Sequence, residues 1–175
     1  MERMAPPPRV TLVLGGARSG KSRHAEGVLA GCRDPVYLAT AEILDAEMAE
    51  RVARHRAARA GSWETVEEPL ALPERLAELA GRAVLVECLT LWLSNLMHAG
   101  RDVERAAAAL VEILPRRAAP TVLVANEVGL GIVPENALAR AFRDHAGRLN
   151  QQIAAVSQRV VFVAAGLPLI LKDVP

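Results

Sequence analysis

The sequence predicts an α/β fold in which helices cover both faces of a mostly parallel β-sheet. Short apolar runs rich in β-forming residues recur along the chain and alternate with longer helical stretches. This alternation is typical of parallel sheets, because each strand needs a crossover connection to reach its neighbour. The first apolar run ends in a glycine-rich segment, and ligands of such folds bind at the carboxyl ends of the strands. We therefore expect a ligand site at that edge of the sheet.

Five strands are expected in chain order. The first covers residues 10–14 and closes on Gly15 and Gly16, as expected of a strand that is buried on both faces. The others are expected at residues 36–39, 84–86, 121–125 and 160–164.

Helices are expected between these strands, over residues 20–30, 44–59, 103–114 and 136–156. In the second of these, Leu44, Met48 and Val52 fall four residues apart and so form one apolar stripe. Gly61 marks the end of this helical stretch.

Length and composition favour one domain. A chain of 175 residues fits a single hydrophobic core, and 51% hydrophobic with 23% charged residues is the balance of a globular protein. We expect residues 9–175 to form a single domain. Residues 1–8, which carry three prolines, are expected to form a flexible amino-terminal tail.

Several classes of protein are disfavoured by the composition. A net charge of +1 and 3% aromatic residues offer no basic stripe and few stacking platforms, so no nucleic-acid partner is expected. No apolar run reaches the roughly 20 residues of a membrane span, and the first residues do not resemble a secretion signal. We expect a cytoplasmic protein. Cys32 and Cys88 are too few and too far apart for a disulfide framework or a zinc cluster and are given no role.

The strongest motif lies between the first strand and the first helix. Residues 15–22 read G-G-A-R-S-G-K-S and satisfy the phosphate-loop pattern G-x-x-x-x-G-K-[ST]. Such a loop turns backbone N–H groups toward phosphate oxygens, and the following helix directs its positive end at the same charge. Lys21 is expected to reach the β and γ phosphates of a nucleoside triphosphate. The alternative is a glycine turn that only connects a strand to a helix.

A magnesium site is expected beside this loop. The hydroxyl of Ser22 is placed by the motif to ligate Mg²⁺, and such sites also use a carboxylate at the end of a neighbouring strand. Glu87 follows the apolar run 83–86 and is our candidate. A solvated or structural glutamate is the alternative, and Glu67 and Glu68 are weaker candidates.

His55 lies among arginines on the predicted helix 44–59. Arg51 and Arg59 stand four residues to either side of it, so one helix face would attract phosphate. Neighbouring cations favour the neutral imidazole, whose lone pair can attack phosphorus. The alternative is a charged surface helix in which His55 is incidental, as His24, His98 and His145 are expected to be.

Further stretches match one known family closely and cover almost the whole chain. They are residues 15–26, 39–42, 45–48, 55–56, 63–65, 87–90 with Asn95, 126–136, 142–144 and 147–151. Through them the chain resembles the bifunctional adenosylcobinamide kinases and adenosylcobinamide-phosphate guanylyltransferases of cobalamin biosynthesis. The stretch 126–136 is specific to this family, whereas the phosphate loop alone indicates only a nucleotide enzyme.

The resemblance implies two successive reactions. A nucleoside triphosphate, ATP or GTP, phosphorylates adenosylcobinamide, and GTP then donates GMP to adenosylcobinamide phosphate with release of pyrophosphate. The guanylyl group passes through a covalent intermediate on the histidine that His55 matches. Some relatives carry two adjacent histidines where this chain has Arg54 and His55.

The resemblance also implies the site residues and the assembly. It points to catalysis by His55 and Lys21, to Mg²⁺ at Ser22 and Glu87, and to a homotrimer with a P-loop NTPase core related to the RecA fold. The expected nucleotide contacts are Gly15, Gly16, Ala17, Arg18, Ser19, Gly20, Lys21, Ser22, Thr40, Ala41, Glu42, Arg56, Ala57, Ala58, Arg59, Glu67 and Glu87.

Two rival functions are consistent with the phosphate loop. An ordinary small-molecule kinase would transfer only the γ phosphate and would need no histidine nucleophile. A nucleotide-dependent switch or motor-like assembly protein would use the loop to report conformation without phosphorylating a substrate.

Overall fold

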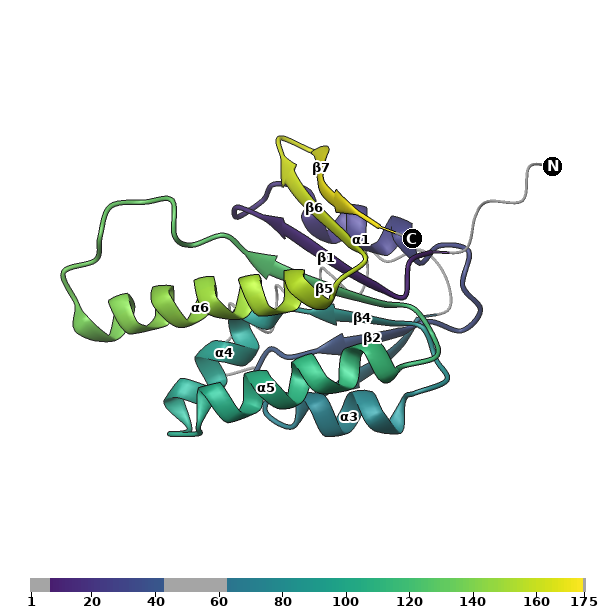
Figure 1. The fold of residues 1–175 in the computed structure, drawn as a ribbon, viewed down its shortest axis with the longest axis horizontal. Coiled ribbons are helices and arrows are strands. Elements are labelled where there is room, and N and C mark those ends of the chain that lie inside the picture. The colour runs from purple at the N-terminus through teal and green to yellow at the C-terminus, as the bar shows by residue number, and fades with distance from the viewer. Residues whose placement is uncertain (1–6, 43–62, 175) are drawn as a thin grey trace.

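The described part of the chain is a seven-stranded sheet with helices on both faces. The computed structural model describes residues 7–42 and 63–174, and Figure 1 shows their arrangement. The strands follow the order β3-β2-β4-β5-β1-β6-β7, and every neighbouring pair is parallel except β6 and β7. Their bounds are β1 Val10–Gly15, β2 Val36–Ala39, β3 Glu64–Glu67, β4 Val84–Glu87, β5 Thr121–Asn126, β6 Arg159–Ala164 and β7 Leu167–Asp173.

The helices join these strands. Their bounds are α1 Lys21–Val28, α3 Leu72–Glu78, α4 Leu89–His98, α5 Val103–Ile113 and α6 Ala137–Val156, with a short 3₁₀ helix at Leu114–Arg116. The three expected helices at 20–30, 103–114 and 136–156 are confirmed within two residues at each end. The expected helix over residues 44–59 lies outside the described residues. No helix within residues 7–42 and 63–174 is both long and apolar enough to cross a membrane.

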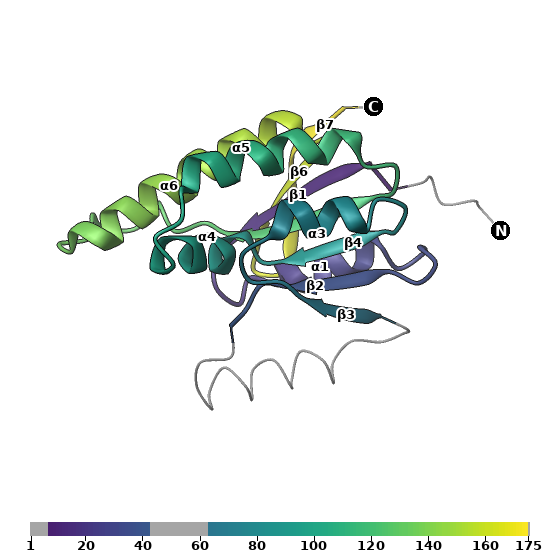
Figure 2. The same ribbon diagram turned by 90° about the horizontal axis from the view of Figure 1, so that it is seen from below.

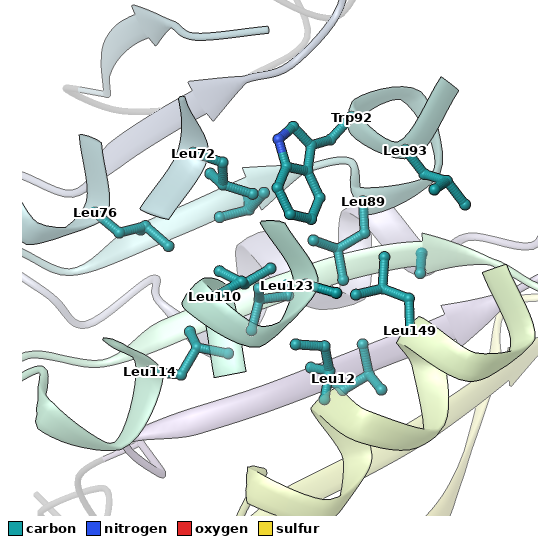
Figure 3. Packing of buried hydrophobic residues seen from close by; sticks show 14 of the residues in the cluster. Leu12, Leu72, Leu76, Leu89, Trp92, Leu93, Leu110, Leu114, Leu123 and Leu149 are labelled. Carbon is teal, nitrogen blue, oxygen red and sulfur yellow. The ribbon is translucent and has the colours of Figure 1, made fainter. Parts of the chain in front are cut away.

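Strands β1, β2, β4 and β5 are buried on both faces, because their side chains point alternately to either side and helices cover both. On one face Leu12 and Leu123 pack with helices α3, α4, α5 and α6, and Figure 3 shows this cluster around Trp92 and Leu110. On the other face Val13 packs with α1. Figure 2 shows α1 on the opposite side of the sheet from α5 and α6. The predicted coverage of both faces is confirmed.

Two helices begin at side-chain caps that the sequence supplies. Asp102 accepts a hydrogen bond from Arg105 N at 3.0 Å before α5, and Asn136 accepts one from Ala139 N at 3.1 Å before α6. These contacts satisfy amides that have no partner within the first turn of a helix. They explain why both helices start one residue after a short polar side chain.

All five expected strands are present, but four described elements were not predicted. These are β3, α3, α4 and β7. In β7 the apolar run that begins in β6 turns back at Ala165 and Gly166, which have φ of 53° and 79°. Positive φ at two successive residues suits a tight hairpin between antiparallel strands. One apolar run therefore forms two strands, although only one strand was expected there.

Candidate functional site

The predicted site residues that fall within 7–42 and 63–174 lie where the parallel strands end. β1 ends at Gly15 and β4 ends at Glu87, and Gly15 pairs with Asn126 at the end of β5. In Figure 1 the arrowheads of β1 and β5 point to the same edge, from which the connection to α6 also leaves. Because β1, β2, β4 and β5 are parallel, their carboxyl ends lie together at one edge, as the sequence predicts.

The phosphate loop connects β1 to α1 as expected. Ser19 N donates to Gly16 O at 3.3 Å inside the loop, and the buried Lys21 donates from Nζ to the same carbonyl at 3.0 Å. α1 begins at Lys21, so its first amides, which lack partners within the helix, lie at the end of the loop. This arrangement of amides, an ammonium group and a helix terminus is suited to a polyphosphate.

The hairpin of β6 and β7 supports the loop from behind. Gly166 N donates to Ser19 O at 2.8 Å. Gly20 has φ of 95°, and a Cβ added to it would lie 3.1 Å from the Cα of Gly166. Glycine is required at position 20 because a side chain there would meet both strain and a neighbouring backbone.

Gly15 is required for a different reason, which is close approach. A Cβ at this position would lie 2.5 Å from Val163 O and 2.5 Å from the hydroxyl oxygen of Ser19. Its own carbonyl accepts a hydrogen bond from Glu127 N at 3.1 Å. The end of β1 is thus held tightly between β5 and β6, and this fixes where the loop starts.

The predicted magnesium ligands meet. Ser22 Oγ donates a hydrogen bond to Glu87 Oε1 at 2.9 Å, from α1 to the end of β4. A hydroxyl beside a carboxylate offers the hard oxygen ligands that Mg²⁺ prefers, with the remaining positions normally taken by phosphate and water. The pair therefore fits the ion that the motif implies.

Thr40 is held firmly against the residue that follows Glu87. Its hydroxyl is fully buried, accepts a hydrogen bond from Cys88 N and donates one to Cys88 O, both at 2.8 Å. Its backbone N donates to Glu87 O at 3.0 Å. Burial, with a smaller contribution from the charge of Glu87, raises the pKa of the Cys88 thiol to about 11, so this thiol is protonated at neutral pH.

The remaining described candidates lie along the same edge. Ala41 and Glu42 follow Thr40 and are half-buried, and Glu67 is exposed at the end of β3 beside Ala39. In the loop, Ala17 and Arg18 are exposed, and Arg18 has φ of 56°. His55, Arg56, Ala57, Ala58 and Arg59 lie outside the described residues.

The histidines that were expected to be incidental lie on helices. Burial, followed by the charge of Arg159, lowers the pKa of His24 on α1. His98 ends α4 and His145 lies within α6. Among the hydrogen bonds of the described residues, none of the three side chains contacts the loop or Glu87, although the backbone N of His24 donates to Gly20 O at 3.1 Å.

Two polar side chains near this edge, Thr90 and Asn95, were missed by sequence reasoning. Thr90 Oγ1 accepts a hydrogen bond from Asn126 N at 2.7 Å, and Asn95 Nδ2 donates to Thr40 O at 2.7 Å and to Pro69 O at 3.1 Å. Both side chains lie on α4, which was not predicted. Residues 87–90 and Asn95 are among the stretches that match the known family. That match could have drawn attention to both side chains, but it assigned neither of them a role.

A cavity of about 470 Å³ lies between α4 and α6. No residue predicted for the phosphate or magnesium site lines it. Its lining residues are Ser94, Met97, His98, Asn136, Leu138, Ala139 and Phe142.

Comparison with solved structures establishes the fold. The chain matches the P4 protein of bacteriophage phi6 in complex with ADP with a TM-score of 0.50 and 19% identity, over 91% of this chain and 53% of that one. It matches an ATPase of a bacterial type III secretion system with a TM-score of 0.51 and 11% identity, over 92% and 56% of the two chains. At these identities only the fold is shared, and the predicted mostly parallel α/β sheet with helices on both faces is confirmed.

Comparison of sequences is more specific. The bifunctional adenosylcobalamin biosynthesis protein CobP of Pseudomonas aeruginosa is 50% identical over 171 residues, which cover 94% of this chain and 98% of that protein. The corresponding protein CobU of Escherichia coli is 44% identical over 92% of this chain and 98% of its own length. The family model described as cobinamide kinase / cobinamide phosphate guanyltransferase matches residues 11–171. This chain therefore belongs to the cobinamide kinase / cobinamide phosphate guanyltransferase family.

Proposed function

We propose that this chain is a bifunctional enzyme that phosphorylates adenosylcobinamide and then transfers GMP from GTP to adenosylcobinamide phosphate. The single observation that carries the proposal is the site at the strand edge, where the loop and the Ser22–Glu87 pair lie together in a member of this family. Both reactions need a triphosphate held by its β and γ phosphates. One phosphate-binding site can therefore serve both reactions.

Binding begins at the loop. Amides of Gly15, Gly16, Ala17, Arg18, Ser19 and Gly20 surround the phosphates, and Lys21 exchanges its contact with Gly16 O for phosphate oxygens. Ser22 and Glu87, whose side-chain oxygens lie 2.9 Å apart, would hold Mg²⁺. The bound ion supplies charge neutralisation at the β and γ phosphates.

In the kinase step the hydroxyl of adenosylcobinamide attacks the γ phosphorus of ATP or GTP. The bond from that phosphorus to the bridging oxygen breaks, the nucleoside diphosphate leaves, and the hydroxyl loses its proton. The contribution of Lys21 is positioning and stabilisation of the charge that develops on the phosphoryl oxygens.

In the second step a ring nitrogen of His55 attacks the α phosphorus of GTP, and pyrophosphate leaves. A phosphate oxygen of adenosylcobinamide phosphate then attacks the guanylyl phosphorus, the bond to His55 breaks, and adenosylcobinamide-GDP is released. Covalent catalysis of this kind divides one difficult transfer into two easier ones. The match of His55 to the family's motif supports this assignment.

Residues at the ends of the neighbouring strands are proposed to contact the nucleoside part of the nucleotide. Thr40, Ala41 and Glu42 follow β2 and Glu67 ends β3, so these residues share the edge that holds the loop. Arg56, Ala57, Ala58 and Arg59 complete the proposed contacts. We propose that the enzyme acts in the cytoplasm, because its proposed substrates ATP and GTP are found there.

A homotrimer is part of the proposal. The edge strand β7 exposes Leu167, Leu169, Ile170 and Leu171, each more than half accessible. Exposed apolar edge strands are prone to association and are usually covered. Sedimentation or light scattering should therefore give a mass of three chains of 18.7 kDa each. A monomer at micromolar concentration would contradict this part of the proposal.

The function is tested with GTP labelled at the α phosphate, adenosylcobinamide phosphate and Mg²⁺. We expect labelled adenosylcobinamide-GDP and, without acceptor, labelled protein. His55→Ala should lose both signals and retain phosphorylation of adenosylcobinamide by ATP. Phosphorylation without any transfer of the α label by the wild-type protein would establish the simple kinase instead. Absence of both reactions would favour the nucleotide-dependent switch.

A further inference from the structure

The side chain of Asn95 joins two strand ends at the edge of the site. Its amide nitrogen donates to Thr40 O at 2.7 Å, just beyond β2, and to Pro69 O at 3.1 Å, just beyond β3. Both partners are carbonyl oxygens, which only accept hydrogen bonds, so the NH₂ group must face them. One amide thereby uses both of its hydrogens to hold two segments that are far apart in the sequence.

Both segments are also held by other hydrogen bonds, and Glu68 N joins them directly by donating to Ala39 O at 2.9 Å. The turn after β3 is also held by Glu68 Oε1, which accepts from Leu70 N and Ala71 N at 3.1 and 2.8 Å, and by Trp92 Nε1, which donates to Leu70 O at 2.9 Å. Thr40 is the last residue of its segment that hydrogen-bonds to β4, through Glu87 O. Among the hydrogen bonds of the described residues, the carbonyl oxygen of Thr40 accepts from Asn95 Nδ2 alone.

The bond to Thr40 O acts on the peptide that leads into Ala41 and Glu42. The Thr40 side chain is already fixed to Cys88, so the added bond from Asn95 determines how the chain leaves β2. Cys88 directly follows Glu87, which receives the hydrogen bond of Ser22. A continuous series of contacts thus connects the loop and magnesium pair to residues 40–42.

We propose that Asn95 is a positioning residue for the nucleoside part of the bound triphosphate. Asn95 holds residues 40–42 and Glu67, the last residue of β3, in a fixed position. We call these residues the rim; they lie at the same edge of the sheet as the phosphate loop. Asn95 itself need not touch the nucleotide. This inference rests on the proposed function, because it takes residues 40–42 and Glu67 as nucleotide contacts.

Binding of the phosphates and binding of the nucleoside should depend on different residues. Inorganic tripolyphosphate with Mg²⁺ needs only the loop, Lys21 and the Ser22–Glu87 pair, whereas GTP also needs the rim. Loss of two hydrogen bonds to the rim should weaken GTP binding about tenfold, which corresponds to roughly 1.4 kcal/mol. Tripolyphosphate binding should be unchanged.

Two variants test this by calorimetric titration of the full-length protein. Asn95→Asp keeps the shape of the side chain but turns acceptors toward two carbonyl oxygens, and Asn95→Ala removes the group in case the first variant folds poorly. We expect both to bind GTP about tenfold more weakly and Mg²⁺-tripolyphosphate as the wild type does. In Asn95→Asp the GTP affinity should recover as pH falls, because a protonated carboxyl can donate one bond again.

Trp92→Phe is the matched control. It loses one hydrogen bond from the same helix to the same turn after β3, but none to Thr40. It should bind GTP as the wild type does, even though its thermal stability falls. GTP affinity unaffected in both Asn95 variants would overturn the inference, and so would equal losses for GTP and tripolyphosphate. A wild-type protein that binds tripolyphosphate but not GTP would instead overturn the proposed function.

Discussion

At the scale of single residues, the pair of Ser22 and Glu87 connects the sequence motif to the chemistry. The sequence alone predicted that both would serve one Mg²⁺, and the structure brings their side-chain oxygens to 2.9 Å. The reason it could be predicted is that a phosphate loop fixes the position of its last serine relative to the neighbouring strand. Glu87 was identified because it follows an apolar run, and that run is β4.

Replacement of Glu87 by Gln tests this pair. The amide keeps the size of the side chain but removes its charge, so we expect about 10- to 100-fold more Mg²⁺ to be needed for half-maximal activity. Titration of the kinase rate with Mg²⁺ measures this requirement.

Glu104→Gln on α5 is the matched control, because it removes a carboxylate from a helix that does not reach the site. It should leave the Mg²⁺ requirement unchanged. An unaltered Mg²⁺ requirement in Glu87→Gln would show that its carboxylate is only structural.

The two cysteines should differ in reactivity. Cys88 is buried and its pKa is raised to about 11, so at neutral pH it carries no thiolate and is shielded from reagents. Cys32 is half-buried, and burial raises its pKa as well. In the native protein a thiol reagent should modify Cys32 slowly and Cys88 only on unfolding. Mass spectrometry of the modified peptides would identify the site, and rapid native labelling of Cys88 would contradict its placement.

At the scale of elements, strands and helices with clear boundary signals could be predicted, and those without such signals could not. The helix expected at 136–156 is α6, in which Asn136 caps a long amphipathic stretch. β3 has only four residues, two of them exposed glutamates at its ends, and so lacks the apolar run that marks the other strands. The position of Glu67 at the site edge therefore could not follow from periodicity.

Asn95 was missed for a related reason. α4 starts at Leu89 directly after β4, with Cys88 at the capping position and no side-chain cap. No boundary signal separates strand from helix there, so the apolar residues of both merge in the sequence. What the side chain contacts, two strand ends from distant parts of the chain, depends on tertiary structure alone.

The start of the phosphate loop should tolerate no side chain. Gly15→Ala places a Cβ 2.5 Å from Val163 O, so β1 or β6 must move and the free energy of unfolding should fall by about 2–4 kcal/mol. Chemical denaturation measures the change, and nucleotide affinity should fall with it.

Gly27→Ala on α1 is the matched control. It meets no atom within 4 Å and should raise helix stability by about 0.5–1 kcal/mol. Equal stabilities for the two variants would contradict the tight fit around Gly15.

Arg117 connects α3 to the sheet in a way that no sequence pattern indicated. Its buried guanidinium donates to Thr121 Oγ1 at 2.7 Å, to Arg82 O at 2.8 Å, to Leu79 O at 3.1 Å and to Leu76 O. Burial lowers its pKa to about 10, so it remains charged at neutral pH. The side chain thus satisfies carbonyls at the carboxyl end of α3, which have no partners within the helix.

Removal of this guanidinium should be costly. Arg117→Ala leaves several buried acceptors without donors and should lower the free energy of unfolding by about 3–5 kcal/mol. Arg116→Ala is the control, since its ion pair with Glu112 is exposed and worth at most about 1 kcal/mol. Similar stability losses in the two variants would contradict the role given to Arg117.

At the scale of the whole molecule, the sheet brings residues that are far apart in the sequence to one edge. The loop follows β1, Thr40 follows β2 and Glu87 ends β4, and the order β2-β4-β5-β1 places them along a single row. The class of fold and this edge could be predicted from the alternation of elements. The antiparallel β7 could not, because its apolar residues continue those of β6 and only the turn at Ala165 and Gly166 reverses the chain.

The extent of the catalytic domain is a further proposal. We propose that residues 9–175 carry both activities and that residues 1–8 are dispensable. A truncated chain that starts at Arg9 should keep both rates within about twofold, since Arg9 still donates from Nη2 to Arg117 O at 2.9 Å. Loss of either activity on truncation would refute the boundary.

The central claim is that one triphosphate-binding site serves both reactions. The most direct test measures Lys21→Ala in the two assays, phosphorylation of adenosylcobinamide by γ-labelled ATP and protein labelling by α-labelled GTP. The account predicts that both rates fall by about 100-fold or more, because the same ammonium group steadies the β and γ phosphates in each. Full retention of either rate in a folded variant would contradict it.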